Sequence, residues 1–114
     1  VPIVAAIAAN VVLSARLRPH DQAAARWAMA SAALMAASLA VFFAWTFPAN
    51  RATRDWTVVP DGWEALRQAW EYSHAANAAI VLAALAATAI AASRTGRRPP
   101  GLAPAASAGE ECGP

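Results

Sequence analysis

The sequence contains no lysine and a single cysteine, and only 14% of its 114 residues are charged. Soluble domains carry roughly 25% charged residues, so this composition argues against a soluble globular domain. The arginines are spread along the chain and are not grouped with aromatic residues, which argues against a nucleic-acid-binding surface. Cys112 has no second cysteine with which to form an internal disulfide, so it gives no information about the redox compartment.

The motifs of several enzyme classes are also missing. There is no C-x-x-C pair, no glycine-rich phosphate loop and no G-x-S-x-G, so zinc ribbons, nucleotide enzymes and serine hydrolases are not indicated. Glu71 and His74 have the E-x-x-H spacing that di-iron bundle proteins use twice, but here it occurs once. The other histidine, His20, is expected on the opposite side of a membrane. The sequence therefore predicts no metal site and no cofactor.

Hydrophobic residues make up 59% of the chain, and alanine supplies most of them. The segments 27–47 and 75–92 contain nothing more polar than serine, threonine and asparagine. A soluble alanine-rich bundle would need a polar face on each helix, and neither segment has one. We therefore predict a multi-pass protein of the cell membrane.

Three helices are expected, at about residues 1–15, 22–47 and 61–93. The first is too short to span a bilayer, so we interpret it as the end of a membrane helix cut by the edge of the fragment. Pro48 should stop the second helix. Asp61 and Glu64 have the spacing of a capping box that opens the third helix, and no proline follows until Pro99. About 33 residues of helix extend about 50 Å, which exceeds a ~30 Å hydrocarbon core.

The predicted fold class is all-α, an antiparallel up-and-down transmembrane bundle with three membrane helices in this fragment of a four-helix protein. Residues 1–98 form the membrane domain, and residues 99–114, rich in Pro, Gly, Ala and Ser, form a disordered tail. Alanine recurs at every fourth position from 24 to 44 and from 75 to 91, a pattern that favours close helix packing in lipid. The sequence does not decide between a monomer and a homo-oligomer.

The arginines predict the orientation of the bundle. Three (Arg51, Arg54, Arg67) lie on the side of the middle loop, and six lie on the side shared by the first loop and the tail (Arg16, Arg18, Arg26, Arg94, Arg97, Arg98). The positive-inside rule makes the latter side cytoplasmic. Loop 48–60 is then extracytoplasmic.

The start of the third helix, residues 61–77, is charged and aromatic, and we call it the collar. Its polar side chains follow one another at steps of three, four, three and three, which places them along one helical face: Glu64, Arg67, Glu71, His74 and Asn77. Trp63 and Trp70 flank this face. A solvated helix end with surface ion pairs would explain the acids and tryptophans. It explains His74 and Asn77 less well, because polar groups at the lipid boundary are costly without a partner or a cavity.

Two motifs resemble those of the anthrone oxygenase-like family, small bacterial and fungal integral membrane proteins grouped as a domain of unknown function. One is a Pro-x-Asn after a membrane helix, here Pro48 and Asn50. The other is W-E-x-x-R-x-x-W-E-x-x-H, here Trp63 to His74. The resemblance covers the last three helices of a four-helix pattern and implies, for a few fungal relatives, oxidation of anthrones to anthraquinones without a cofactor.

Such a reaction needs a base, an oxyanion donor and an apolar pocket. His74 is the candidate base, since its unperturbed pKa lies near 6.5. Arg67, or the amide of Asn50 or Asn77, could donate to the oxyanion. The candidates for stacking on the substrate are Trp56, Trp63, Trp70 and Tyr72. Glu64 and Glu71 are assigned a structural role.

Two other interpretations stay open. In one, His74 bonds to Asn50 or Glu71 and pins the loop to the bundle. In the other, the protein is a structural or accessory membrane protein whose collar docks a partner. The expected partners are therefore the lipid bilayer and either a hydrophobic aromatic molecule or another protein.

Overall fold

The computed structural model describes residues 2–96, and the predicted tail at 99–114, with Cys112, lies outside this range. Five helical elements follow one another: α1 (Pro2–Leu17), α2 (Gln22–Val41), the π-helical turn η1 (Phe42–Thr46), α3 (Phe47–Ala52) and α4 (Trp63–Thr95). No strand occurs between residues 2 and 96. The all-α prediction is confirmed.

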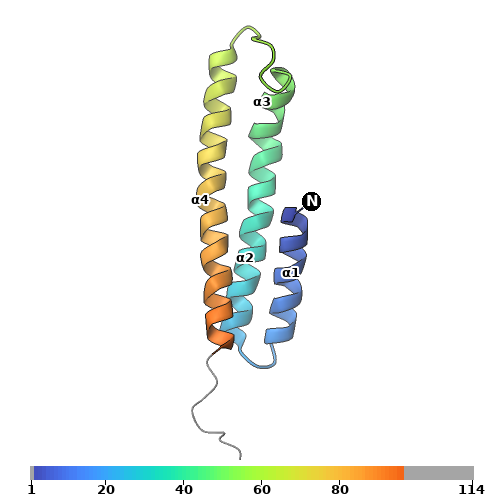
Figure 1. The fold of residues 1–114 in the computed structure, drawn as a ribbon, viewed down its shortest axis with the longest axis vertical. Coiled ribbons are helices and arrows are strands. Elements are labelled where there is room, and N and C mark those ends of the chain that lie inside the picture. Colours follow the sequence, from blue (N-terminus) through green and yellow to red (C-terminus); the bar gives the residue numbers. More distant parts are fainter. Residues whose placement is uncertain (1, 97–114) are drawn as a thin grey trace, which may run out of the picture.

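The helices lie side by side along one axis (Figure 1). α2 packs against α1 and against α4, and α4 continues beside η1 and α3. Two helical stretches are long and apolar enough to cross a membrane: Gln22–Ala52, with 31 residues, and Trp63–Thr95, with 33. α1, with 16 residues, is a shorter apolar helix. The helix predicted at about 61–93 is α4, which begins and ends two residues later than expected.

Asp21 connects the start of α2 to the end of α4. Its side chain caps α2 by accepting a hydrogen bond from the backbone N–H of Ala24 at 3.0 Å. The Nε of Arg94 lies 3.6 Å from the other carboxylate oxygen. The pKa of Asp21 lies below its ordinary value, chiefly because the Ala24 N–H stabilises the charged form and with help from the Arg94 charge.

The prediction that Pro48 stops the second helix is wrong. Helical structure continues through η1 and α3 to Ala52. A proline inside an α-helix lacks an N–H, and its ring clashes with the carbonyl four residues earlier. Here the turn before Pro48 is widened, because the N–H of Phe47 bonds to the carbonyl of Phe42, five residues back. The π-helical turn makes room for the ring, so the helix passes Pro48.

Small residues fill the interior, and large apolar residues face outward. Every buried hydrophobic residue between positions 2 and 96 is an alanine, and the largest fully buried side chains are Thr46, Thr53, Ser14 and Ser31. Exposed large side chains occur on all the long helices, among them Val4, Val12, Phe43, Trp45, Leu82 and Leu85. Soluble domains show the opposite distribution.

One side of α4 carries buried or half-buried residues that follow one another at alternating steps of four and three: Ser73, Asn77, Ile80, Ala84, Ala87 and Ala91. We call this line the seam. Its period of 3.5 is that of left-handed helix pairs. The alanines predicted at every fourth position of this helix therefore do not all lie on the seam. Ala87 and Ala91 are buried, whereas Ala75, Ala79 and Ala83 are exposed.

Hydroxyl groups connect the helices across the interior. Ser31 Oγ donates to the Ala84 carbonyl at 2.9 Å and lies 2.7 Å from Thr88 Oγ1. Thr88 Oγ1 donates to Asn10 Oδ1 at 3.3 Å, which brings α1 into the same network. Nearer the loop, the hydroxyls of Thr46 and Ser73 lie 2.8 Å apart. These bonds fix the level at which α2 and α4 face each other, so they position the collar relative to α3.

Candidate aromatic binding site

The loop after α3 begins with a tight C-terminal cap. The N–H of Arg54 bonds to the Arg51 carbonyl, and the N–H of Asp55 bonds to the Asn50 carbonyl, as in a Schellman motif. Three consecutive residues then have left-handed backbone: Arg54 (φ 48°), Asp55 (φ 54°) and Trp56 (φ 65°). For residues other than glycine this conformation costs roughly 1–2 kcal/mol each, so the turn must be held in place by other contacts.

Thr53 supplies these contacts from a fully buried position, at 0% exposure. Its hydroxyl donates to the Ala49 carbonyl at 2.8 Å and accepts from the N–H of Trp56 at 3.2 Å. Its own carbonyl accepts hydrogen bonds from the N–H groups of Thr57 and Val58, both at 3.1 Å. One residue therefore anchors both sides of the left-handed turn and sets where Trp56 lies.

Trp56 folds back towards α4. Its indole Nε1 donates to Asn50 Oδ1 at 3.2 Å, and its ring meets Trp70 edge to face, with centroids 5.8 Å apart. Trp70 in turn lies against His74, with ring centroids 3.9 Å apart and planes inclined by 33°. Asn50 and His74 thus sit at opposite ends of one row of rings, without direct contact.

The hydrogen bond made by His74 defines its tautomer. Nδ1 lies 3.0 Å from the Trp70 carbonyl oxygen. A carbonyl oxygen can only accept, so Nδ1 carries the hydrogen, and in the neutral ring Nε2 has the free lone pair. Within residues 2–96, His74 forms no bond to Asn50 or Glu71, the two partners that a purely loop-pinning role predicted. The side chain keeps a basic nitrogen.

A cavity of about 370 Å³ opens beside these rings. Its surface is mostly apolar, and the residues that line it are Trp56, Val59, Trp63, Arg67, Trp70 and Glu71. Arg67 Nε donates to Glu71 Oε1 at 2.7 Å, and both side chains are at least half exposed. No ion pair joins Glu64 to Arg67 in the described part of the chain. His74 lies behind Trp70 and does not line the cavity.

Two of the predicted site residues lie elsewhere. Tyr72 faces a separate hollow of about 450 Å³ on another side of α4, together with Trp45 and Ser73. Asn77 belongs to the seam, and its Oδ1 is buried without a hydrogen-bond partner. The structure therefore brings Trp56, Trp63 and Trp70 together but separates Tyr72 and Asn77 from them.

Val59 is a lining residue that the sequence reasoning missed. Two adjacent valines, Val58 and Val59, stand in an otherwise polar loop, and this was the available signal. Among residues 2–96, no three His, Cys, Asp or Glu side chains lie close enough to hold a metal ion. Glu71, the acid of the E-x-x-H pair, is engaged by Arg67.

No protein-family model, curated protein or solved structure matches this chain. The resemblance to the anthrone oxygenase-like family therefore rests on the residues of the two motifs. In the structure both motifs contribute to the row of rings, Asn50 from the first and Trp70 and His74 from the second.

Replacing Thr53 with valine should destabilise the fold and release Trp56. Valine keeps the shape of threonine but leaves the Trp56 N–H without an acceptor, and such a loss costs about 1–3 kcal/mol. Denaturant unfolding in detergent, followed by tryptophan fluorescence, measures the effect. The exposed Thr57, whose hydroxyl bonds locally to Arg54, is the control, and Thr57→Val should change stability by less than about 0.5 kcal/mol. Equal stability of both variants would mean that Thr53 does not hold the turn.

Proposed function

We propose that this chain is part of a multi-pass integral membrane protein whose collar binds a flat, hydrophobic aromatic molecule. The observation that carries the proposal is the cavity of about 370 Å³ bounded by three tryptophans from two elements. Its volume falls in the range of small-molecule sites, which are mostly apolar with a few polar groups at defined places.

The inverted distribution of side chains supports the membrane part of the proposal. Alanine, serine and threonine fill the helix contacts, while valine, leucine, phenylalanine and tryptophan face outward. In lipid, large apolar side chains gain nothing by being buried, whereas small residues allow helices to approach closely. In this proposal α1, α2 and α4 form an up-and-down transmembrane bundle, with the α1–α2 loop cytoplasmic and the collar at the outer face.

The geometry of the rings supports an aromatic ligand. Trp56 and Trp70 meet edge to face, so their planes form two walls at an angle of 77°. A planar molecule can stack on one wall and meet the other with its edge, and both arrangements are favoured by ring quadrupoles. The surface of the cavity is mostly apolar, and Arg67 offers guanidinium hydrogens to an oxygen on the ligand.

A chemical step follows if the ligand carries a weakly acidic ring proton, as an anthrone does. Because His74 lies beside Trp70 and outside the lining of the cavity, the step requires a ligand that extends past the Trp70 ring. There His74 Nε2 removes one proton from the methylene carbon, and Arg67 stabilises the resulting oxyanion. The enolate gives one electron to dioxygen, and the two radicals combine; the proton held by His74 completes a hydroperoxide. Loss of water from the hydroperoxide gives the quinone, with one oxygen atom in the new carbonyl and the other in water. Dioxygen is the oxidant, and no cofactor is required.

The competing proposal is an accessory membrane protein whose collar docks a protein partner. It requires no cavity and no free base, so the lining of the Trp56–Trp70 cavity and the tautomer of His74 favour the small-molecule site. Measurements of aromatic ligand binding distinguish the small-molecule site from the docking surface.

Trp70→Leu should weaken binding of an anthraquinone, used as a non-oxidisable probe, about 3- to 10-fold through the loss of stacking. Quenching of tryptophan fluorescence measures the affinity for protein in lipid nanodiscs. The control is Trp27→Leu, since Trp27 lies near the other end of α2 and also faces outward. If both variants bind the probe as the parent does, the probe merely dissolves in lipid and the aromatic site is refuted.

A further inference from the structure

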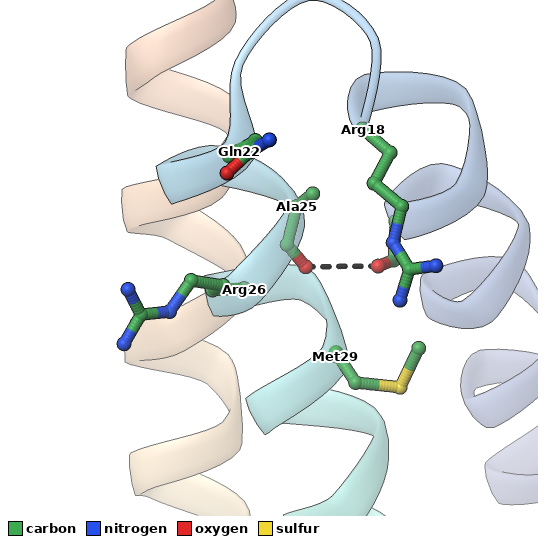
Figure 2. A pocket seen from close by; sticks show the side chains of 6 residues that line it. Arg18, Gln22, Ala25, Arg26 and Met29 are labelled. Carbon is green, nitrogen blue, oxygen red and sulfur yellow. Dashed lines mark hydrogen bonds between the residues drawn. The ribbon is translucent and has the colours of Figure 1, made fainter.

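A hollow lined by two arginines lies at the opposite end of the molecule from the collar. It has a volume of about 280 Å³ and lies between the end of α1 and the start of α2. Figure 2 shows the residues that line it: Ser14, Arg18, Gln22, Ala25, Arg26 and Met29. None of them contributes to the aromatic site, so the hollow is a separate feature.

The floor of the hollow is fixed by a buried hydrogen bond between the helices. Ser14 Oγ donates to the Ala25 carbonyl at 2.9 Å, and both residues are almost fully buried. Arg18 runs alongside this bond, while Arg26 extends from α2 in another direction (Figure 2). The guanidinium group of Arg18, just after the end of α1, therefore lies beside a floor that holds its shape, and Arg26 lines the hollow from α2 with its guanidinium group directed away from Arg18.

The charges at this hollow are not neutralised by the described residues. Neither Arg18 nor Arg26 makes an ion pair with any residue between positions 2 and 96. The acid closest in sequence, Asp21, accepts a hydrogen bond from the Ala24 N–H and faces Arg94. The amide of Gln22 adds a neutral donor to the same rim. The hollow is thus suited to an anion.

We infer that this hollow binds the phosphate of an anionic glycerophospholipid. The inference rests on the membrane part of the proposed function and is independent of the aromatic site. Guanidinium groups bind phosphate oxygens through paired N–H donors, and basic hollows between membrane helices on the cytoplasmic side are typical sites for anionic headgroups. The hollow lies at the start of α2, which is the level of the headgroups if α2 crosses the bilayer.

The surroundings favour a lipid over a free phosphate ion. Met29 lies at the inner edge of the hollow and is 40% exposed, which offers an apolar surface directly beside the charges. A neighbouring hollow shares Arg26 and is otherwise lined by Ala23, Trp27 and Ala30. An amphiphile can place its phosphate at the arginines and its glycerol and acyl carbons on Met29 and Trp27. A free ion would use only the charged rim.

Lipid binding to the full chain in detergent is measurable by native mass spectrometry with phosphatidylglycerol and phosphatidylcholine. We expect the parent protein to prefer phosphatidylglycerol, and Arg18→Gln or Arg26→Gln to lower its affinity about five-fold each. Arg16→Gln is the matched control, because Arg16 is exposed at the same end but does not line the hollow. That change should lower the affinity less than about two-fold, as expected for a charge outside the site.

Three results would overturn the inference. An equal loss in Arg16→Gln would indicate diffuse attraction, and equal affinity of the parent for both lipids would exclude headgroup recognition. Displacement of phosphatidylglycerol by millimolar inorganic phosphate would identify a soluble anion as the ligand. Failure of the aromatic site leaves this assay unchanged, whereas failure of the chain to float with phosphatidylcholine vesicles would refute membrane insertion itself.

Discussion

Replacing His74 with alanine is expected to lower the rate of dioxygen uptake with an anthrone by about 10²- to 10⁴-fold, the range typical for loss of a general base. His74 is the only histidine near the cavity in the described chain, and its Nδ1–H is committed to the Trp70 carbonyl. Nε2 of the neutral ring therefore keeps a free lone pair and can act as the base. An oxygen electrode records the rate for protein reconstituted in lipid.

The matched control is His20→Ala, because His20 lies in the loop between α1 and α2, at the other end of the molecule. The His20→Ala variant should take up dioxygen as fast as the parent protein does. Equal rates in all three proteins, or no uptake above the uncatalysed background with any anthrone or related phenol, would count against the oxygenase. The accessory role would then be the better account of the collar.

Enlarging Ala84 to leucine should separate α2 from α4. Ala84 is at 0% exposure in the seam, and its carbonyl accepts the hydrogen bond from Ser31. Overpacking at such a position costs typically 1–3 kcal/mol or more, and the Ser31 bond would be lost with the close approach of the helices. Unfolding in mixed micelles, followed by circular dichroism, should show a clear loss of stability.

Ala83→Leu provides the comparison at the adjacent position. Ala83 is exposed on the outer face of α4, where Leu82 and Leu85 already stand. The same change in volume should be close to neutral there, within about 0.5 kcal/mol. If Ala83→Leu destabilised the protein as much as Ala84→Leu, the assigned seam would be on the wrong side of the helix.

The long helices could be predicted because the absence of charge over 27–47 and 75–92 is a strong signal that needs no tertiary information. The passage of the helix through Pro48 could not. A proline usually ends a helix, and the widened turn that accommodates this one depends on a hydrogen bond between Phe47 and Phe42 that has no separate sequence signature. The left-handed turn at Arg54–Trp56 was equally hidden, because such turns normally contain glycine.

The residues of the collar could be predicted from the sequence, but the directions of their side chains could not. Steps of three and four keep neighbours on one face, yet the small deviation from 3.6 accumulates. Asn77, thirteen positions after Glu64, is turned away from it by about 140° at 100° per residue. Asn77 is therefore half-buried in the seam while Glu64 is exposed. Trp56 joined the site only because Thr53 and Asn50 hold the loop against α4, and such contacts are tertiary.

The narrow, small-residue interior also determines which mutations this protein can accept. In a soluble domain, changes of polarity in the core are the harmful ones, and surface positions vary freely. Here the interior already contains hydroxyl groups beside alanine, so an exchange of alanine for serine is a small change, whereas added volume separates the helices. Under the proposed membrane insertion the opposite holds at the outer positions: leucine, valine and phenylalanine can replace one another, and a charge cannot take their place in lipid. Selection on this fold therefore limits the size of residues inside and their polarity outside.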